Sequence, residues 1–150
     1  MRNFHLKASS LNRKIKFWFL VTVCASVIFL DQLSKVILTK TNPSLITYNT
    51  GLAFGLGQSL GLGLSIIGLL LAVIFMIRTN ALRSNLLWIL SLALILGGGV
   101  SNIIDRIRLG YVVDISNFGI ALLSINLADL AVVIGIVTTF YKIILSQNNG

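Results

Sequence analysis

Acidic side chains are almost absent from this sequence of 150 residues. It contains no glutamate, and its four carboxylates, Asp31, Asp105, Asp114 and Asp129, all lie within or beside long apolar segments. Only 11% of the residues are charged, whereas a soluble domain of this size keeps roughly 25% charged residues. The composition therefore excludes a soluble protein and predicts a single membrane-embedded domain, 1–150. Ionisable groups inside such a domain are expected to be functional.

Cysteine and histidine occur once each, which excludes several kinds of catalytic and metal site. Cys24 lies in the first apolar segment, and His5 lies in the basic segment that precedes it. A lone cysteine forms no intramolecular disulfide, and neither residue has the partners that a thiol or imidazole nucleophile or a zinc site requires. We therefore expect no metal and no organic cofactor, and we expect aspartate to carry any chemistry.

Four apolar segments reach the length of about 20 residues that a membrane-spanning helix needs. They cover residues 17–38, 60–77, 86–104 and 122–145, and they follow a basic tail at 1–16. Eight of the twelve lysines and arginines fall on the side of the tail, and four fall on the other side. This excess predicts that both termini are cytoplasmic. Anionic lipid explains the basic tail, so we expect no nucleic-acid partner.

The connectors on the opposite side are not ordinary polar loops. Residues 44–56 and 111–115 are rich in β-branched and aromatic residues, and the first of these segments also contains glycines typical of tight turns. We expect them to form a small extracytoplasmic β-platform on the bilayer. The predicted fold is an all-α integral membrane protein with four transmembrane helices and this platform.

Two of the four aspartates have polar partners close in sequence. Lys35 lies one helical turn after Asp31, a spacing that favours a structural ion pair over a direct chemical role for Asp31. Asp105 directly precedes Arg106 and follows Asn102 by three residues, so these residues are interpreted as a hydrogen-bonded brace. Both groups are therefore predicted to be scaffold.

Asp114 and Asp129 remain, and neither has a cation at helical spacing. Two carboxylates in one low-dielectric site share a proton, and such a pair activates water for attack on an amide. Asn126 precedes Asp129 by three residues, where its amide either orients a carboxylate or caps the fourth helix. The residues thus favour a membrane aspartic peptidase.

Five short motifs occur in a fixed order along the chain. They are Asp31-Gln32-Leu33-Ser34-Lys35; Tyr48-Asn49-Thr50-Gly51 with Ala53-Phe54; Gly97-Gly98 with Asn102 and Asp105-Arg106; Gly110 with Val112-Val113-Asp114; and Asn126-Leu127-Ala128-Asp129. Together they resemble the bacterial lipoprotein signal peptidases, the type II signal peptidase family. The resemblance covers residues 17–141.

This resemblance implies an endopeptidase that removes the signal peptide from prolipoproteins, cutting just before the diacylglyceryl-modified cysteine. It implies that Asp114 and Asp129 are the catalytic pair and that Asp31 stabilises the fold. We also interpret Lys35 and Asp105 as structural residues. The positions that line or brace the substrate site in this family correspond to Asn49, Gly98, Asn102, Arg106 and Asn126. We expect a monomer in the bacterial cytoplasmic (inner) membrane, in contact with lipid, with its active site on the extracytoplasmic side.

The chain departs from the family pattern at three positions. Ser101 replaces the usual glycine before Asn102, and Ile115 and Ile125 stand where phenylalanine is common. The connector between Asp114 and Asn126 is also short. These changes are expected to affect the shape of the pocket rather than the reaction.

Two other functions fit parts of the sequence. A four-helix cation- or proton-coupled transporter would also keep aspartates in its helices, but it requires them near the midplane rather than towards one side. A serine peptidase using Ser34 and Lys35 requires adjacent helical positions to meet, although they point about 100° apart.

Overall fold

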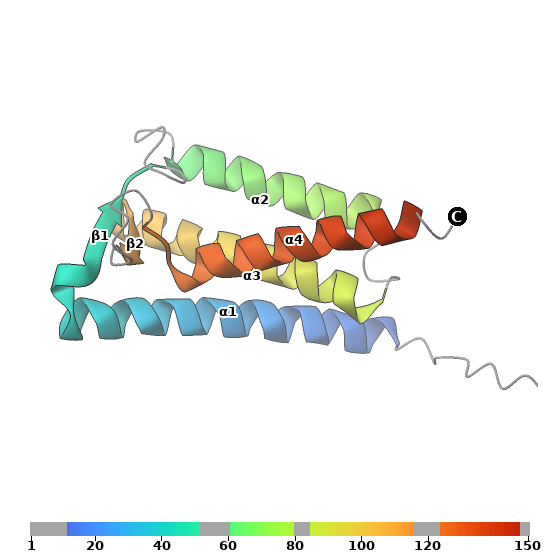
Figure 1. Ribbon diagram of the computed structural model, residues 1–150, viewed down its shortest axis with the longest axis horizontal. Coiled ribbons are helices and arrows are strands. Elements are labelled where there is room, and N and C mark those ends of the chain that lie inside the picture. Colours follow the sequence, from blue (N-terminus) through green and yellow to red (C-terminus); the bar gives the residue numbers. More distant parts are fainter. Residues whose placement is uncertain (1–11, 52–60, 80–84, 116–123, 148–150) are drawn as a thin grey trace, which may run out of the picture.

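The computed structural model describes residues 12–51, 61–79, 85–115 and 124–147, and it contains four long helices that run alongside one another (Figure 1). These are α1 (Arg13–Thr41), α2 (Gly61–Arg78), α3 (Leu86–Leu109) and α4 (Leu127–Gln147). All four are long and apolar enough to cross a membrane. Large apolar side chains such as Phe29, Ile77 and Val137 are more than 60% exposed, which suits contact with lipid tails.

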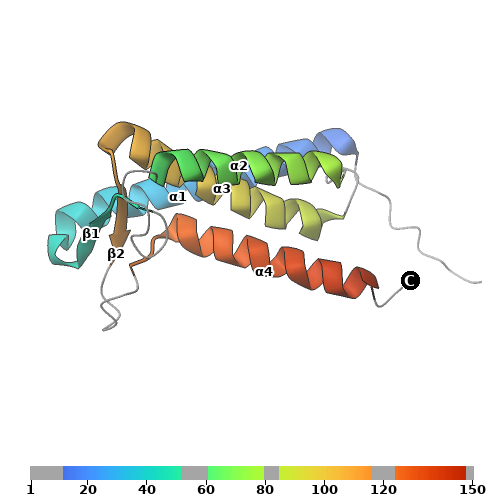
Figure 2. The ribbon, with the colours of Figure 1, turned by 90° about the horizontal axis from the view of Figure 1, so that it is seen from above.

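Helix α3 is the centre of the bundle and packs against each of the other three helices (Figures 1 and 2). Its residues Ile89, Leu92 and Ala93 are at most 1% exposed. Gly98 allows α4 to approach, because a Cβ atom there would collide with the carbonyl oxygen of Ala128. The first turn of α4 is therefore held directly against α3.

A two-stranded antiparallel sheet lies at the end of the bundle opposite the C-terminal end of α4 (Figure 1). A short 3₁₀ helix (Pro43–Leu45) leads from α1 into β1 (Ile46–Asn49), which pairs with β2 (Val112–Ile115). Gly110 ends α3 in the left-handed conformation, with φ of 83°, and so turns the chain into β2. The sheet matches the platform predicted from the two β-prone connectors.

The helix boundaries differ from the sequence prediction at both ends of the molecule. Helix α1 begins at Arg13, within the expected basic tail, and α3 continues to Leu109, so Asp105 lies within the helix. Helix α4 begins at Leu127 rather than at 122, because the Asn126 side chain accepts from the peptide N–H of Asp129 and caps the helix. Residues 122 and 123 lie outside the described part of the chain.

Candidate active site

Asp114 lies on β2 and is fully buried between two asparagines. Asn49 of the neighbouring strand donates to its Oδ2 at 3.0 Å, and Asn126 donates to its Oδ1 at 2.6 Å. Burial raises the pKa of Asp114 to about 6 and the charge of Asp129 adds to this rise, although the two asparagines oppose it. A carboxyl group with this pKa exchanges its proton close to neutral pH.

Asp129 lies in the first turn of α4, where the Asn126 cap fixes its peptide N–H at 2.8 Å. The side-chain amide of Asn102, on α3, donates to Oδ1 of Asp129 at 2.7 Å. The two carboxyl groups therefore come from a strand and a helix that are distant along the chain. Each accepts from asparagine, the donor type that orients a carboxylate without neutralising it.

The two asparagines beside the carboxylates are also bonded to each other. Nδ2 of Asn126 donates to Oδ1 of Asn102 at 3.2 Å, so amides connect Asp114 to Asp129. The orientation of each amide follows from its other partner. Asn102 also faces the ammonium of Lys35 at 3.3 Å, and Asn126 also faces a peptide N–H. Because those partners only donate, both carbonyl oxygens must face them, and both NH₂ groups face the carboxylates.

Asp114 and Asp129 line the same cavity, which has a volume of about 270 Å³. Its lining combines polar groups with apolar side chains. The remaining lining residues are Asn49, Asn102, Arg106, Val112, Ser124, Ile125, Val132 and Val133. A cavity with two carboxyl groups, amide donors and an apolar wall has room for a water molecule and part of an extended peptide.

Arg106 connects α3 to the segment that follows β1. Its guanidinium donates to the carbonyl oxygen of Gly51 and to the carbonyl oxygen of Asn102 at 3.4 Å. Its Nε is buried and makes no hydrogen bond within the described part of the chain. Arg106 thus links α3 to the segment that follows β1, and it also contributes positive charge near both carboxylates of the cavity.

Asp105 differs from the sequence interpretation, because its cation is Lys35 on α1 rather than the adjacent Arg106. The Lys35 ammonium lies 2.7 Å from Oδ2 of Asp105 and 2.6 Å from Oδ2 of Asp31. The expected pair of Asp31 and Lys35 is therefore present, but it is part of a larger buried cluster. Asp31 also accepts from the peptide N–H of Ala128 at 2.9 Å, which fixes the start of α4.

Sequence reasoning did not assign roles to two residues of this cluster. Ser101, noted only as a departure from the family pattern, donates to Oδ2 of Asp31 at 2.7 Å. Gln32 donates to Oδ1 of Asp105 at 2.7 Å and to the hydroxyl of Ser101 at 3.1 Å. Gln32 stands in a quoted motif, yet nothing in its spacing indicates a partner on another helix.

Gly98 lies outside the lining of the cavity and acts through the packing of α3 on α4. The alternative pair of Ser34 and Lys35 does not meet. The Ser34 hydroxyl donates to the carbonyl oxygen of Asp31 at 2.8 Å, whereas the Lys35 ammonium contacts the buried carboxylates. A serine nucleophile activated by this lysine is therefore wrong for the observed geometry.

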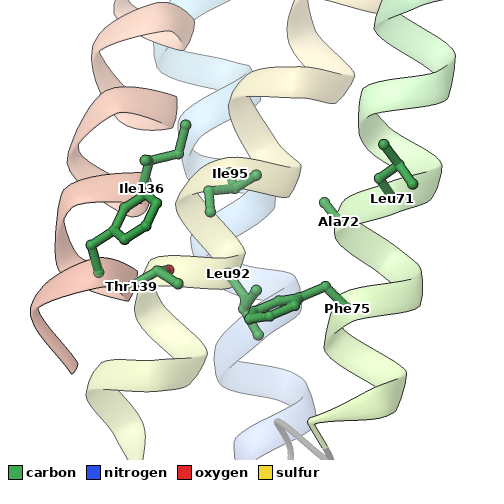
Figure 3. Close-up of a pocket in the computed structure, with 8 residues that line it drawn as sticks. Leu71, Ala72, Phe75, Leu92, Ile95, Ile136 and Thr139 are labelled. Atoms are coloured by element: carbon green, nitrogen blue, oxygen red, sulfur yellow. The ribbon is translucent and has the colours of Figure 1, made fainter. Parts of the chain in front are cut away.

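A second cavity, of about 340 Å³, lies between α2, α3 and α4 (Figure 3). It is lined by apolar side chains and one threonine: Leu71, Ala72, Phe75, Leu92, Ile95, Ile136, Thr139 and Phe140. On α4 this lining begins seven residues beyond Asp129, about 10 Å along the helix. None of the described residues that line it is titratable, so they can hold apolar groups but supply no acid–base chemistry.

Comparison with known proteins gives consistent results. The profile of the family described as signal peptidase (SPase) II matches residues 23–145. A lipoprotein signal peptidase of Caldanaerobacter subterraneus subsp. tengcongensis is 34% identical over 83% of this chain and 94% of its own length. A lipoprotein signal peptidase of Coxiella burnetii (strain RSA 493) is 32% identical over 88% of this chain and 91% of its own length.

Solved structures give the same fold. A bacterial membrane enzyme determined by the in meso method at 2.3 Å resolution superposes with a TM-score of 0.71, at 24% identity, over 87% of this chain and 90% of that one. Another, determined at 1.9 Å, superposes with a TM-score of 0.66, at 26% identity, over 83% and 91%. The overall fold is therefore shared with bacterial membrane enzymes.

Proposed function

This chain belongs to the signal peptidase II family and is an aspartic endopeptidase that cleaves signal peptides from prolipoproteins; from that premise we propose that Asp114 and Asp129 are its catalytic pair. The observation that carries the proposal is that both carboxyl groups line one cavity and accept from bonded asparagines. The other two carboxylates of the chain are bound to Lys35. Among the four aspartates, only Asp114 and Asp129 line this cavity and make no ion pair with a described residue.

The reaction follows from two carboxyl groups that share one proton. The ionised carboxylate takes a proton from water, and the water oxygen attacks the scissile carbonyl carbon. The protonated partner gives its proton to the carbonyl oxygen, and the C–N bond then breaks as the leaving amine takes up a proton. The products are the signal peptide with a new carboxylate and the lipoprotein with a free amine on its lipid-modified cysteine.

Asparagine donors suit this chemistry because they fix both carboxyl groups without forming an ion pair. A lysine or arginine at hydrogen-bond distance would hold its partner permanently ionised, and the pair would then lack its acid. Asn49, Asn102 and Asn126 therefore position the pair. Arg106 and Gly98 brace the walls around it.

The lipid of the substrate needs an apolar site that opens towards the bilayer. The cavity between α2 and α4 is apolar and begins about 10 Å from Asp129 along α4. We assign the acyl chains of the diacylglyceryl group to this groove, with the modified cysteine at the pair. Substrate would then enter sideways from the membrane.

The charge distribution supports a cytoplasmic location for both termini. Arg13 and Lys14 at the start of α1 and Arg78 at the end of α2 lie at the end of the bundle away from the sheet. This arrangement supports an extracytoplasmic location for the sheet and the catalytic pair, in a protein of the bacterial inner membrane. The proposed unit is a monomer of one domain.

Replacement of either aspartate by asparagine tests the pair. Asp114→Asn and Asp129→Asn each remove a proton-transfer group and should lower cleavage of a lipid-modified precursor by at least about a hundredfold. Ser34→Ala serves as the control and should cleave normally. Full activity in either asparagine variant, with normal membrane insertion and thermal stability, would refute the assignment. Family membership does not favour the transporter alternative, which predicts ion uptake by proteoliposomes without cleavage.

A further inference from the structure

A third cavity lies on the other face of the sheet from the catalytic pair. Side chains alternate between the two faces of a strand, so Asn49 and Asp114 line the catalytic cavity, whereas Tyr48 and Val113, which are cross-strand partners, line the third one. This cavity has a volume of about 280 Å³ and is bounded by the outer ends of α1 and α3. It does not include either catalytic carboxylate.

Two cations of this cavity have no carboxylate partner. Lys40 and Arg108 both line it, and neither makes an ion pair within the described part of the chain. The sequence has four acidic side chains in all, of which two are bound to Lys35 and two form the catalytic pair. The only described polar contact of Arg108 is a long bond of 3.4 Å to Oε1 of Gln32. An anion that pairs with these two cations would therefore come from outside the described part of the chain.

The rest of the lining suits a lipid headgroup. Tyr48 and Tyr111 pack with ring centroids 4.8 Å apart, and neither hydroxyl bonds to another described residue. Tyrosine is enriched at the membrane interface because its ring is apolar and its hydroxyl is polar. Val36 and Leu109 also line the cavity, and they are exposed apolar side chains, at 53% and 44% exposure.

We propose that this cavity binds the phosphate of an anionic phospholipid headgroup. Lys40 and Arg108 contact the phosphate, the tyrosine hydroxyls supply further donors, and Val36 and Leu109 contact the first carbons of the acyl chains. The site rests on the proposed function only for its membrane setting, since it places the sheet at the bilayer surface. Gln32, Lys35 and Asp105 also line this cavity, so the headgroup would lie directly beside the Lys35 cluster. Gln32 connects the two, because it contacts both Arg108 and Asp105.

The test measures which lipid stays bound to the intact protein. The full chain is reconstituted in nanodiscs of equal parts phosphatidylglycerol and phosphatidylcholine, released, and examined by native mass spectrometry. The double variant Lys40→Gln/Arg108→Gln should lose preferential retention of phosphatidylglycerol by about thirtyfold, as expected for removal of two cations from an anionic lipid surface. The matched control is Arg13→Gln/Lys14→Gln, which removes the same two residue types from the opposite end of α1 and should keep the preference.

Equal retention of phosphatidylglycerol by both double variants would overturn the proposal, and so would equal losses in both. A third arm adds inorganic phosphate to the wild-type complex. Displacement of the lipid by free phosphate at millimolar concentration would show a simple anion site and would overturn the assignment to a headgroup. The measurement needs no cleavage, so its failure is distinct from failure of the catalytic pair.

Discussion

Asn102 and Asn126 are hydrogen bonded to each other at 3.2 Å, and each donates to a different carboxylate of the catalytic pair. Donor-only groups on the far side of each amide fix its direction. The separation of the two carboxyl groups therefore depends on a contact between two uncharged side chains. Substitutions in this chain of amides should affect catalysis more than they affect folding.

Asn126 has two functions that different substitutions separate. Asn126→Ser keeps an oxygen that can cap α4, whereas Asn126→Ala does not, and both lose the donor to Asp114. We expect Asn126→Ala to lower stability by about 1 kcal/mol and Asn126→Ser to stay close to wild type. Both should lower kcat/KM. Thermal unfolding in detergent and a cleavage assay measure the two effects, and full activity of the serine variant would contradict the role of the amide.

Asn49 should set the acid side of the pH–activity profile. Asn49→Ser retains an acceptor for the peptide N–H of Gly51, but serine is too short to donate to Asp114. Loss of a donor to the ionised carboxylate raises the pKa of Asp114 further above its value of about 6. Activity that requires an ionised Asp114 should then fall off at higher pH than in the wild type. An unchanged acid limb of kcat/KM would rule out Asp114 as the group that titrates there.

The stability of the folded protein should depend on pH because the pKa of Asp114 is raised on folding. The folded value of about 6 exceeds the ordinary value of 3.8, so the folded protein binds more protons than the unfolded chain between these two values. This residue's contribution to stability is therefore fully present below about pH 4 and is lost as the pH rises through about 6. In Asp114→Asn this dependence should disappear. Unfolding temperatures of both proteins across this range provide the comparison, and parallel curves would contradict the shift.

Asp31→Asn should lower stability more than turnover. Asp31 is fully buried and accepts from Lys35, Ser101 and the peptide N–H of Ala128. Breaking a buried ion pair by removing one partner costs about 3–5 kcal/mol, although Lys35 keeps Asp105 in this variant and the loss should lie at the lower end. Activity per folded molecule should remain within a few-fold of wild type. A variant as heat-resistant as the parent yet inert would place Asp31 among the reacting groups.

Gly98→Ala should weaken the contact between α3 and α4. The added methyl group meets the carbonyl oxygen of Ala128 and must displace the first turn of α4, which carries Asp129. Overpacking of this kind costs about 1–3 kcal/mol. Gly68→Ala is the matched control, because a Cβ atom there meets nothing within 4 Å on α2. Equal stability and activity of the two variants would show that the close approach is unimportant.

The sequence was sufficient for the features that depend on local pattern. Four apolar segments, a sheet from two β-prone connectors and the spacing of Asp31 and Lys35 all follow from hydrophobic length, residue type and helical period. The catalytic pair was reached by elimination of the other aspartates and by family resemblance. Its chemical role remains a prediction.

Contacts between helices could not be predicted in this way. The partner of Asp105 depends on how α1 and α3 are rotated against each other, and the nearest cation in sequence, Arg106, points elsewhere. Asn102, which was interpreted as part of a brace, also donates to Asp129, and its spacing in the sequence does not indicate this partner. Polar partners inside a bundle are chosen by packing, and packing is set by side chains distant along the chain.

The backbone bridge between Ile115 and Ile125 has a consequence for how this protein can evolve. It pins together the two points where the chain leaves Asp114 and returns to Asn126, through hydrogen bonds of 3.0 and 3.3 Å. Because this bridge holds the two ends together, the positions of the reacting groups do not depend on the number of residues between Ile115 and Ile125. Lengthening a loop also adds little entropic cost. The length of chain between residues 115 and 125 can therefore change in this protein while Asp114 and Asn126 stay in place.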